Sequence, residues 1–251
     1  MKIQGIDVDV MRKGKGPPLL MLHGGDGPIA GMPFVAKLAE HFEVIAPTHP
    51  GFGGSRIPDN FTRVDDLTFL YLDLLDALEL TDIVLLGFSM GGWTALELAT
   101  MNSARLSKLI LVDSVGVKLG GREDRDIADI FGLPFETLTK LMWHDPAKAP
   151  DISELTEEQL RIVAANRMAL GVYTWEPYMH NPKLPQRIHR IKIPTHFIWG
   201  ASDGIVTVDY GRKFCALIRG AKMSVIEEAG HFPQVEQPHA FVDSVLRFAG
   251  K

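Results

Sequence analysis

The pentapeptide Gly87-Phe88-Ser89-Met90-Gly91 places a serine between two glycines in a setting that suits a nucleophile. A short apolar run at 83–86 precedes it and a helical stretch at 93–101 follows, so the serine is expected at a sharp turn between a strand and a helix. Glycines two residues before and after the serine let the helix pack closely on the strand. Such a turn raises the hydroxyl above the sheet, where it can attack a carbonyl carbon. The alternative is a serine in an ordinary glycine-rich turn.

A serine hydroxyl needs a base within hydrogen-bond reach, and the base needs a third group to orient it. Asp203 lies in a tight loop after the apolar run 193–199, and His231 follows the strand-like segment 223–226. Open α/β folds carry their sites at the carboxyl edge of the sheet, so both side chains are expected there. Asp113, at the end of the run 109–112, is the alternative acid. A plain turn aspartate at 203 and a structural histidine at 231 are the simpler alternatives.

Other histidines and the single cysteine suit this chemistry less well. His231 combines the right chain order with a loop after a strand, whereas its rivals lie in early loops, a strand or a helix; these rivals are His23, His49, His196 and His239. We expect Cys215 to be a core or half-buried residue on a helix, because no histidine partner is suggested for it.

The residues between these candidates alternate between strand and helix patterns. Apolar runs at 19–22, 44–46, 109–112 and 196–199 have the length of strands buried on both faces. Helical periodicity marks 34–42, 67–78 and 241–248, and Thr62 with Asp65 predicts a capping box for the second of these. Alternating residues at 3–10 predict an edge hairpin. The pattern predicts an α/β fold with a mostly parallel sheet covered by helices on both faces.

The alternation stops between residues 115 and 190, where prolines separate short helical pieces. We interpret residues 115–190 as a helical cap inserted into a core formed by 1–114 and 191–251. A chain of 251 residues fits one large domain. The apolar side chains of the cap suggest a pocket with an apolar wall; they are Phe131, Phe135, Leu138, Trp143, Met168, Tyr173, Trp175 and Tyr178.

Composition excludes several other classes of function. The formal charge is −5 and no basic run occurs, which argues against binding nucleic acid. One cysteine cannot form an intramolecular disulfide, and neither a signal peptide nor a run of about 18 apolar residues is evident, so we expect a cytoplasmic protein without a membrane partner. No metal-binding or nucleotide-binding spacing is present, and we expect no metal and no cofactor. The sequence leaves open whether the protein forms a homo-oligomer.

Taken together, these motifs resemble the α/β-hydrolase fold family over essentially the whole chain. His23-Gly24-Gly25 resembles the family's His-Gly turn, and residues 49–55 resemble its next turn, with Thr48 where aspartate is common. The resemblance implies the order serine, acid, histidine, and an oxyanion hole from the N–H groups of Met90 and of Gly25 or Asp26.

Within this family the chain is similar to the serine hydrolase and carboxylesterase branch. The expected reaction is two-step acyl transfer on a small-molecule ester or lactone, since dehalogenases and epoxide hydrolases of this fold carry aspartate where Ser89 stands. We expect Asp26, Phe88, Trp143 and Phe232 to bind substrate, although Asp26 could be merely solvated. The alternatives are a cofactor-free haloperoxidase-type perhydrolase, a carbon–carbon bond hydrolase of aromatic ring-cleavage products, and a ligand-sensing receptor. The carbon–carbon bond hydrolases often have a small polar residue where this chain has Phe88.

Overall fold

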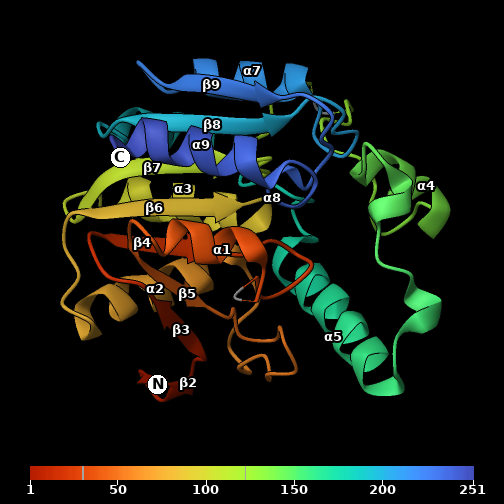
Figure 1. Ribbon diagram of the computed structural model, residues 1–251, viewed down its shortest axis with the longest axis horizontal. Coiled ribbons are helices and arrows are strands. Elements are labelled where there is room, and N and C mark those ends of the chain that lie inside the picture. The colour runs from red at the N-terminus through yellow and green to blue at the C-terminus, as the bar shows by residue number, and fades with distance from the viewer. Residues whose placement is uncertain (30, 122) are drawn as a thin grey trace.

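A seven-stranded sheet forms the centre of the computed structural model, which describes residues 1–29, 31–121 and 123–251 (Figure 1). The strand order is β3-β5-β4-β6-β7-β8-β9, and β3 alone among these strands runs antiparallel to its neighbour. Their bounds are Val10–Lys13 for β3, Pro18–Leu22 for β4, Glu43–Pro47 for β5, Ile83–Phe88 for β6, Leu106–Val112 for β7, Thr195–Gly200 for β8 and Lys222–Ile226 for β9. The predicted, mostly parallel sheet is confirmed, because its central strands are the short apolar runs of the sequence.

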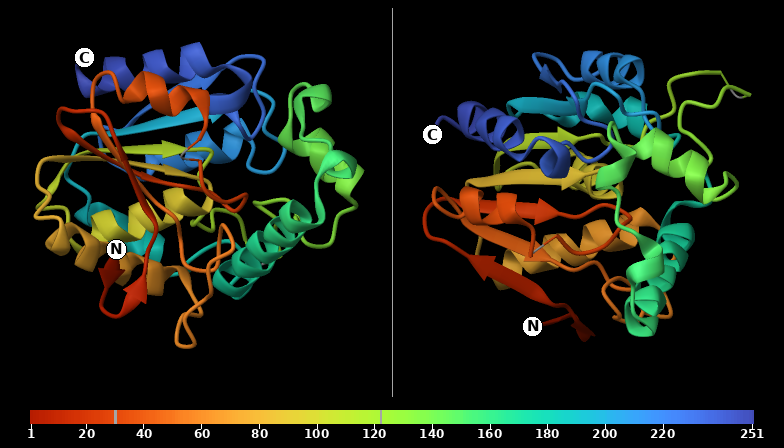
Figure 2. Two further views of the ribbon diagram at one scale, coloured as in Figure 1. Left: turned by 60° about the horizontal axis from the view of Figure 1, so that its bottom comes forward. Right: turned by 45° about the vertical axis from the view of Figure 1, so that its right-hand side comes forward.

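Helices cover both faces of this sheet (Figure 2). On one face lie α1 (Pro33–Leu38) and α9 (Pro238–Ala249), which contact each other through Phe34 and Phe241. On the other face lie α2 (Val64–Ala77), α3 (Met90–Met101) and α7 (Val208–Ala216). A separate buried apolar cluster fills each side, so the sheet is dry on both faces. This burial explains why the central strands β4 and β6 are continuously apolar rather than alternating.

Two local predictions differ from the structure. The N-terminal hairpin is limited to β1 (Lys2–Ile3) and β2 (Ile6–Asp7), and the following strand β3 pairs with β5 at the sheet edge instead. The N-cap of α2 is Arg63, one residue after the predicted cap Thr62, and the carboxylate of Asp66, rather than Asp65, accepts hydrogen bonds from the N–H groups of Thr62 and Arg63.

The region between β7 and β8 carries helices and turns beyond the carboxyl edge of the sheet, on the right in Figure 1. Its principal helices are α4 (Phe135–Met142) and α5 (Glu157–Thr174). Helix α5 has 18 residues, which is longer than the short pieces that the prolines suggested. Shorter elements complete the region: η1 (Pro146–Lys148), η2 (Ile152–Glu154), α6 (Leu184–Arg187) and η3 (Ile188–Arg190). The division at 115 and 190 into core and cap stays a prediction.

No helix within the described part of the chain combines the length and the apolar character needed to cross a bilayer.

Candidate active site

Ser89 occupies a strained turn between β6 and α3. Its φ of 47° and ψ of −114° are unusual for a residue with a side chain. The turn is possible only because neighbouring backbones approach closely: a Cβ on Gly87 would collide with the carbonyl of Gly91, and one on Gly91 would collide with the carbonyls of Leu22 and His23. The two glycines therefore let α3 pack against the ends of β6 and β4. The Ser89 side chain is left half-buried at the carboxyl edge of the sheet.

Asp203 and His231, which are 28 residues apart, meet at the same edge. The Nδ1 atom of His231 lies 2.7 Å from Oδ2 of Asp203, and both side chains are almost fully buried. The other carboxylate oxygen of Asp203 accepts hydrogen bonds from the N–H groups of Ile205 at 2.8 Å and Val206 at 3.1 Å. These donors hold the carboxylate in its ionised form. The proton of the neutral imidazole is thereby placed on Nδ1, and Nε2 keeps the lone pair that a base needs.

The electrostatics of His231 combine opposing effects. Burial disfavours the imidazolium, but the charge and hydrogen bond of Asp203, together with the charge of Asp26, outweigh it and raise the pKa of His231 above its usual value of 6.5. An imidazole of this kind accepts a proton readily and holds it next to a carboxylate. This is the behaviour expected of a general base.

The end of α4 holds the loops of both residues, which sequence reasoning missed. The carbonyl oxygen of Leu141 accepts a hydrogen bond from Gly204 N at 2.8 Å, and that of Met142 accepts one from His231 N at 2.6 Å. Backbone carbonyls leave no signal in a sequence, so these contacts could not have been found there. A buried carboxylate, Glu236, also binds Gly230 N at 2.7 Å and reaches the backbone of residues 144 and 145.

The predicted oxyanion turn passes directly against the nucleophile. A Cβ on Gly24 would lie 3.2 Å from Cβ of Ser89, and Met90 begins α3 immediately after the serine. The backbone N–H groups at Met90 and Gly25 are therefore in the region where a developing oxyanion would need donors. Their role as the hole stays a prediction.

A network of neutral histidines supports this turn. His23 Nε2 accepts a hydrogen bond from His49 N at 2.9 Å, and His49 Nε2 donates to the carbonyl oxygen of His23, also at 2.9 Å. The hydroxyl of Tyr71 on α2 binds the remaining nitrogen, His49 Nδ1. Burial lowers the pKa of His23 to about 4 and that of His49 well below its usual value. This arrangement supports a structural role for His23 in holding the turn.

The four predicted substrate contacts lie in different surroundings. Phe88 is buried in the core against Phe34 and Phe241, which favours a packing role instead. Trp143 packs on Phe232, the residue after the candidate base, with ring centroids 4.8 Å apart. Of the cap side chains expected to form an apolar wall, three are exposed at the surface: Phe135, Met168 and Trp175.

Asp26 is an exposed residue, yet many protein atoms surround its carboxyl group. Loss of hydration raises its pKa, while the charges of His231 and Arg167 act in the opposite direction. Among the substrate contacts predicted, Asp26 is therefore the one that is both accessible and within the electrostatic range of the candidate base.

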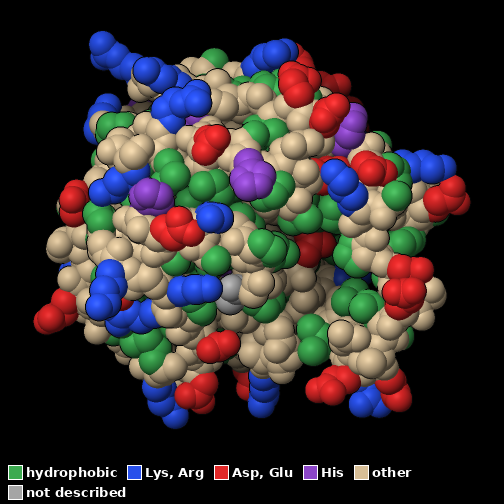
Figure 3. Space-filling model, in the orientation of Figure 1, with side chains coloured by type: hydrophobic (Ala, Val, Ile, Leu, Met, Phe, Trp, Pro, Cys, Tyr) green, Lys and Arg blue, Asp and Glu red, His purple; other side chains and the backbone are tan. Residues whose placement is uncertain are grey.

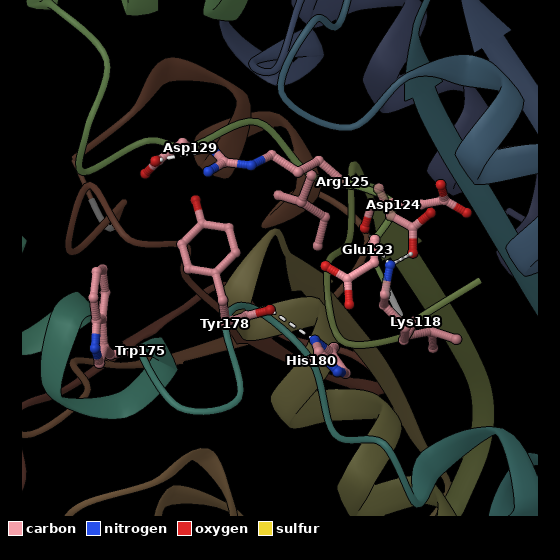
Figure 4. Close-up of a pocket in the computed structure, with 11 residues that line it drawn as sticks. Lys118, Glu123, Asp124, Arg125, Asp129, Trp175, Tyr178 and His180 are labelled. Carbon is pink, nitrogen blue, oxygen red and sulfur yellow. Dashed lines mark hydrogen bonds and ion pairs between the residues drawn. The ribbon is translucent and has the colours of Figure 1, made fainter. Parts of the chain in front are cut away.

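The surface is hollowed between the sheet body and the region of α4 and α5, where hydrophobic and acidic side chains gather (Figure 3). A separate cavity of about 390 Å³ is lined by Trp175, Tyr178, His180 and residues 117–118, 123–127 and 129, and contains no member of the candidate triad (Figure 4). Its Arg125 and Asp129 form an ion pair at 3.0 Å, and Lys118 binds Asp126. These charged side chains are paired with each other, and Ser89 stays the candidate nucleophile.

Within the described residues, no hydrogen bond joins the Ser89 hydroxyl to His231. Such contacts are often long in a free enzyme and tighten when substrate binds. The geometry of a nucleophile at a strained strand-to-helix turn, beside an aspartate–histidine pair on the same sheet edge, defines the class of α/β-hydrolases.

The comparison with known proteins agrees. A family model described as "Alpha/beta hydrolase family" matches residues 19–244, and the chain belongs to this family. The 2-hydroxy-6-oxo-6-(2'-aminophenyl)hexa-2,4-dienoic acid hydrolase of Metapseudomonas resinovorans is 27% identical, with 98% of this chain and 89% of that protein covered. The 3-oxoadipate enol-lactonase 2 of Acinetobacter baylyi is 28% identical, with coverages of 85% and 82%. A crystal structure of a membrane phospholipase A shares the fold, with a TM-score of 0.85, 22% identity and coverages of 100% and 84%.

Proposed function

We propose that this α/β-hydrolase is a serine hydrolase that cleaves a small-molecule carboxylic ester or lactone. The observation that carries the proposal is the placement of Ser89 in a strained turn on the edge where Asp203 and His231 form a buried hydrogen-bonded pair. In the proposed reaction His231 Nε2 takes the hydroxyl proton as Ser89 attacks the substrate carbonyl. The imidazolium then protonates the leaving oxygen, and water hydrolyses the acyl-enzyme in the reverse manner.

One feature favours cleavage of a C–O bond: the relative from Acinetobacter baylyi is named as an enol-lactonase. The carboxylate of Asp203, 2.7 Å from His231, would stabilise the imidazolium formed in the first step until the leaving group takes the proton.

The test is reaction with a fluorophosphonate probe followed by peptide mapping. We expect the label on Ser89 in the parent protein and no label in Ser89→Ala, because only an activated serine attacks the phosphorus. Steady-state hydrolysis of p-nitrophenyl esters of increasing acyl length should be sustained in the parent and lost in Ser89→Ala. A label on another residue of the folded protein would remove the basis of the proposal, and a protein that binds ligand without sustained turnover would favour the receptor alternative.

Carbon–carbon bond hydrolysis is the second candidate. It is favoured by the relative from Metapseudomonas resinovorans, whose name describes hydrolysis of a hydroxy-oxo-dienoic acid. The same triad would serve, but the leaving group is then a carbon rather than an oxygen. Assays of lactones, p-nitrophenyl esters and 2-hydroxy-6-oxo-dienoic acids side by side, each with Ser89→Ala as the blank, should give the highest kcat/KM for an ester or lactone. A preference for the dienoic acids would assign the second candidate.

A further inference from the structure

Asp113 lies between the candidate nucleophile and the candidate acid and is not explained by the triad. It follows β7, which is the strand between β6 and β8 in the sheet. Donor atoms of Asp113, Asp203 and His231 all lie within 4.8 Å of one another, and all three residues are buried. The backbone of Asp113 has a φ of +41°, which is a conformation that a residue with a side chain rarely adopts. A strained residue at this place suggests a function for its side chain.

The two carboxyl groups are unequally supplied with donors. Asp203 accepts hydrogen bonds from Ile205 N, Val206 N and His231 Nδ1. Asp113 accepts one, from Gly200 N to Oδ1 at 2.9 Å, while its Oδ2 atom is buried without a partner among the described residues. Two neighbouring buried carboxylates cannot both ionise at low cost, so the better-solvated one carries the charge. The donors identify that group as Asp203.

We infer that Asp113 is a neutral carboxylic acid that donates its proton from Oδ2 to the carboxylate of Asp203, and so acts as a positioning residue for the acid of the triad. Burial and the charge of Asp203 both raise the pKa of Asp113 well above its usual value, which agrees with this assignment. The inference rests on the proposed function as far as its catalytic consequence is concerned. The protonation state itself does not depend on that function.

The consequence concerns the strength of the base. A further donor to Asp203 stabilises its negative charge and weakens its pull on the His231 proton. His231 therefore stays less basic than it would be with Asp203 and its backbone donors alone. Two other charged groups act here. Asp26, in the loop after β4, raises the pKa of His231, and Arg167 on α5 lowers the pKa of Asp26.

The first test is infrared difference spectroscopy at neutral pH. Subtracting the spectrum of Asp113→Asn from that of the parent should reveal the C=O stretch of one carboxylic acid. The matched control is Asp129→Asn, since the pKa of Asp129, which pairs with Arg125, is lowered and its difference spectrum should show only a carboxylate. A carboxylate signal for Asp113 would overturn the inference. This readout needs no substrate, so it stands apart from failure of the proposed function.

The second test is titration of the His231 imidazole by NMR in the parent, Asp113→Asn and Asp113→Leu. Asparagine keeps an N–H donor toward Asp203 and an acceptor for Gly200 N, so it should retain the parental pKa. Leucine removes the donor and should raise the pKa of His231 by roughly half a unit to one unit. If Asp113 were ionised, both variants would lower this pKa, and a purely structural residue would leave it unchanged in both; either result contradicts the inference. If Asp113→Leu does not fold, the asparagine variant and the infrared band still decide the question.

Discussion

At the scale of single residues, the proposed chemistry depends on the titratable side chains around His231 at the carboxyl edge of the sheet. Asp203 has its negative charge surrounded by N–H donors, and the imidazole of His231 faces it at 2.7 Å. Asp26 adds a second carboxylate that acts on the imidazole from the solvent side. The working pH range of the proposed enzyme therefore follows from these side chains.

Replacement of Asp26 by asparagine should move the acid limb of the pH profile. His231 must be neutral to accept a proton, so kcat/KM falls as the pH drops through its pKa, which lies above the usual 6.5. Removing the charge of Asp26 lowers that pKa, and the limb should move to lower pH. The measurement is kcat/KM on the preferred ester from about pH 5 to about pH 9, a range that includes the ordinary pKa of histidine.

Glu157→Gln is the control for this experiment, because Glu157 also loses one charge but pairs with Arg161 on the exposed start of α5. Its acid limb should coincide with that of the parent. A limb that stays in place in Asp26→Asn, or moves to higher pH, would contradict the assigned effect of Asp26 on His231.

At the scale of elements, the oxyanion turn is supported by strands and helices that are distant in sequence. The imidazole of His49, after β5, bonds to the backbone of His23, after β4, and to Tyr71 on α2. The Nε2 atom of His23 accepts a hydrogen bond while its Nδ1 faces the carbonyl of Gly24, so both partners are kept only if the His23 ring is neutral. The three elements are thus joined by a network that protonation of His23 would break.

This network predicts a specific loss of stability in acid. The pKa values of both histidines are lowered in the folded protein, whereas the unfolded chain binds protons near 6.5. Stability is therefore complete above about pH 6.5 and declines as the pH falls toward about 4, by up to ~1.4 kcal/mol per pH unit for each histidine. Urea denaturation at about pH 7 and about pH 5, on either side of the histidine pKa in the unfolded chain, measures this decline in the free energy of unfolding.

In His49→Gln one titrating group is absent, so the difference in the free energy of unfolding between the two pH values should shrink even though the variant is less stable at both. His189→Gln, which removes an exposed histidine on η3, should keep the parental difference. An equal decline in the parent and in His49→Gln would show that His49 is not held neutral by the fold.

At the scale of the whole molecule, helix α5 connects the region after β7 to the two loops that flank the site. The side chain of Asn166 donates to Asp26 O at 2.8 Å and accepts from Gly53 N at 2.9 Å. The hydroxyl of Tyr173 donates to Pro50 O at 3.0 Å. Through these contacts the position of α5 determines the position of the oxyanion turn.

Asn166→Ala should therefore affect both stability and catalysis. Two backbone groups lose a buried partner, which should cost about 1–3 kcal/mol in the free energy of unfolding. The loop that contains Gly25 and Asp26 loses its anchor, and kcat/KM should fall by roughly tenfold or more if this loop supplies the oxyanion donor proposed for it. Arg161→Ala, on the exposed part of the same helix, is the control and should change neither quantity strongly. Parental kinetics in a destabilised Asn166→Ala would show that α5 has no influence on the turn.

Much of this protein could be derived from its sequence because the relevant signals are local. The strands at 83–88 and 195–200 are buried on both faces, so most of their residues are apolar, and the glycines around Ser89 are required by the close approach of neighbouring backbones. The candidate nucleophile, base and acid follow from residue type and from their places after such strands. The departures at the N-terminal hairpin and at the start of α2 concern the ends of elements, where one or two residues and their hydrogen-bond partners decide the boundary.

Tertiary structure decided the features that depend on which elements pack together. Phe88 faces the core because α1 and α9 cover that side of β6, and no pattern within the pentapeptide specifies the covered side. The carbonyl oxygens of Leu141 and Met142 hold the acid and base loops, yet any residue type would present them. The unequal hydrogen bonding of Asp113 and Asp203 arises only when three adjacent strands bring their loops together. Sequence determines which groups can react, whereas packing determines which of them lose water and therefore where charge resides.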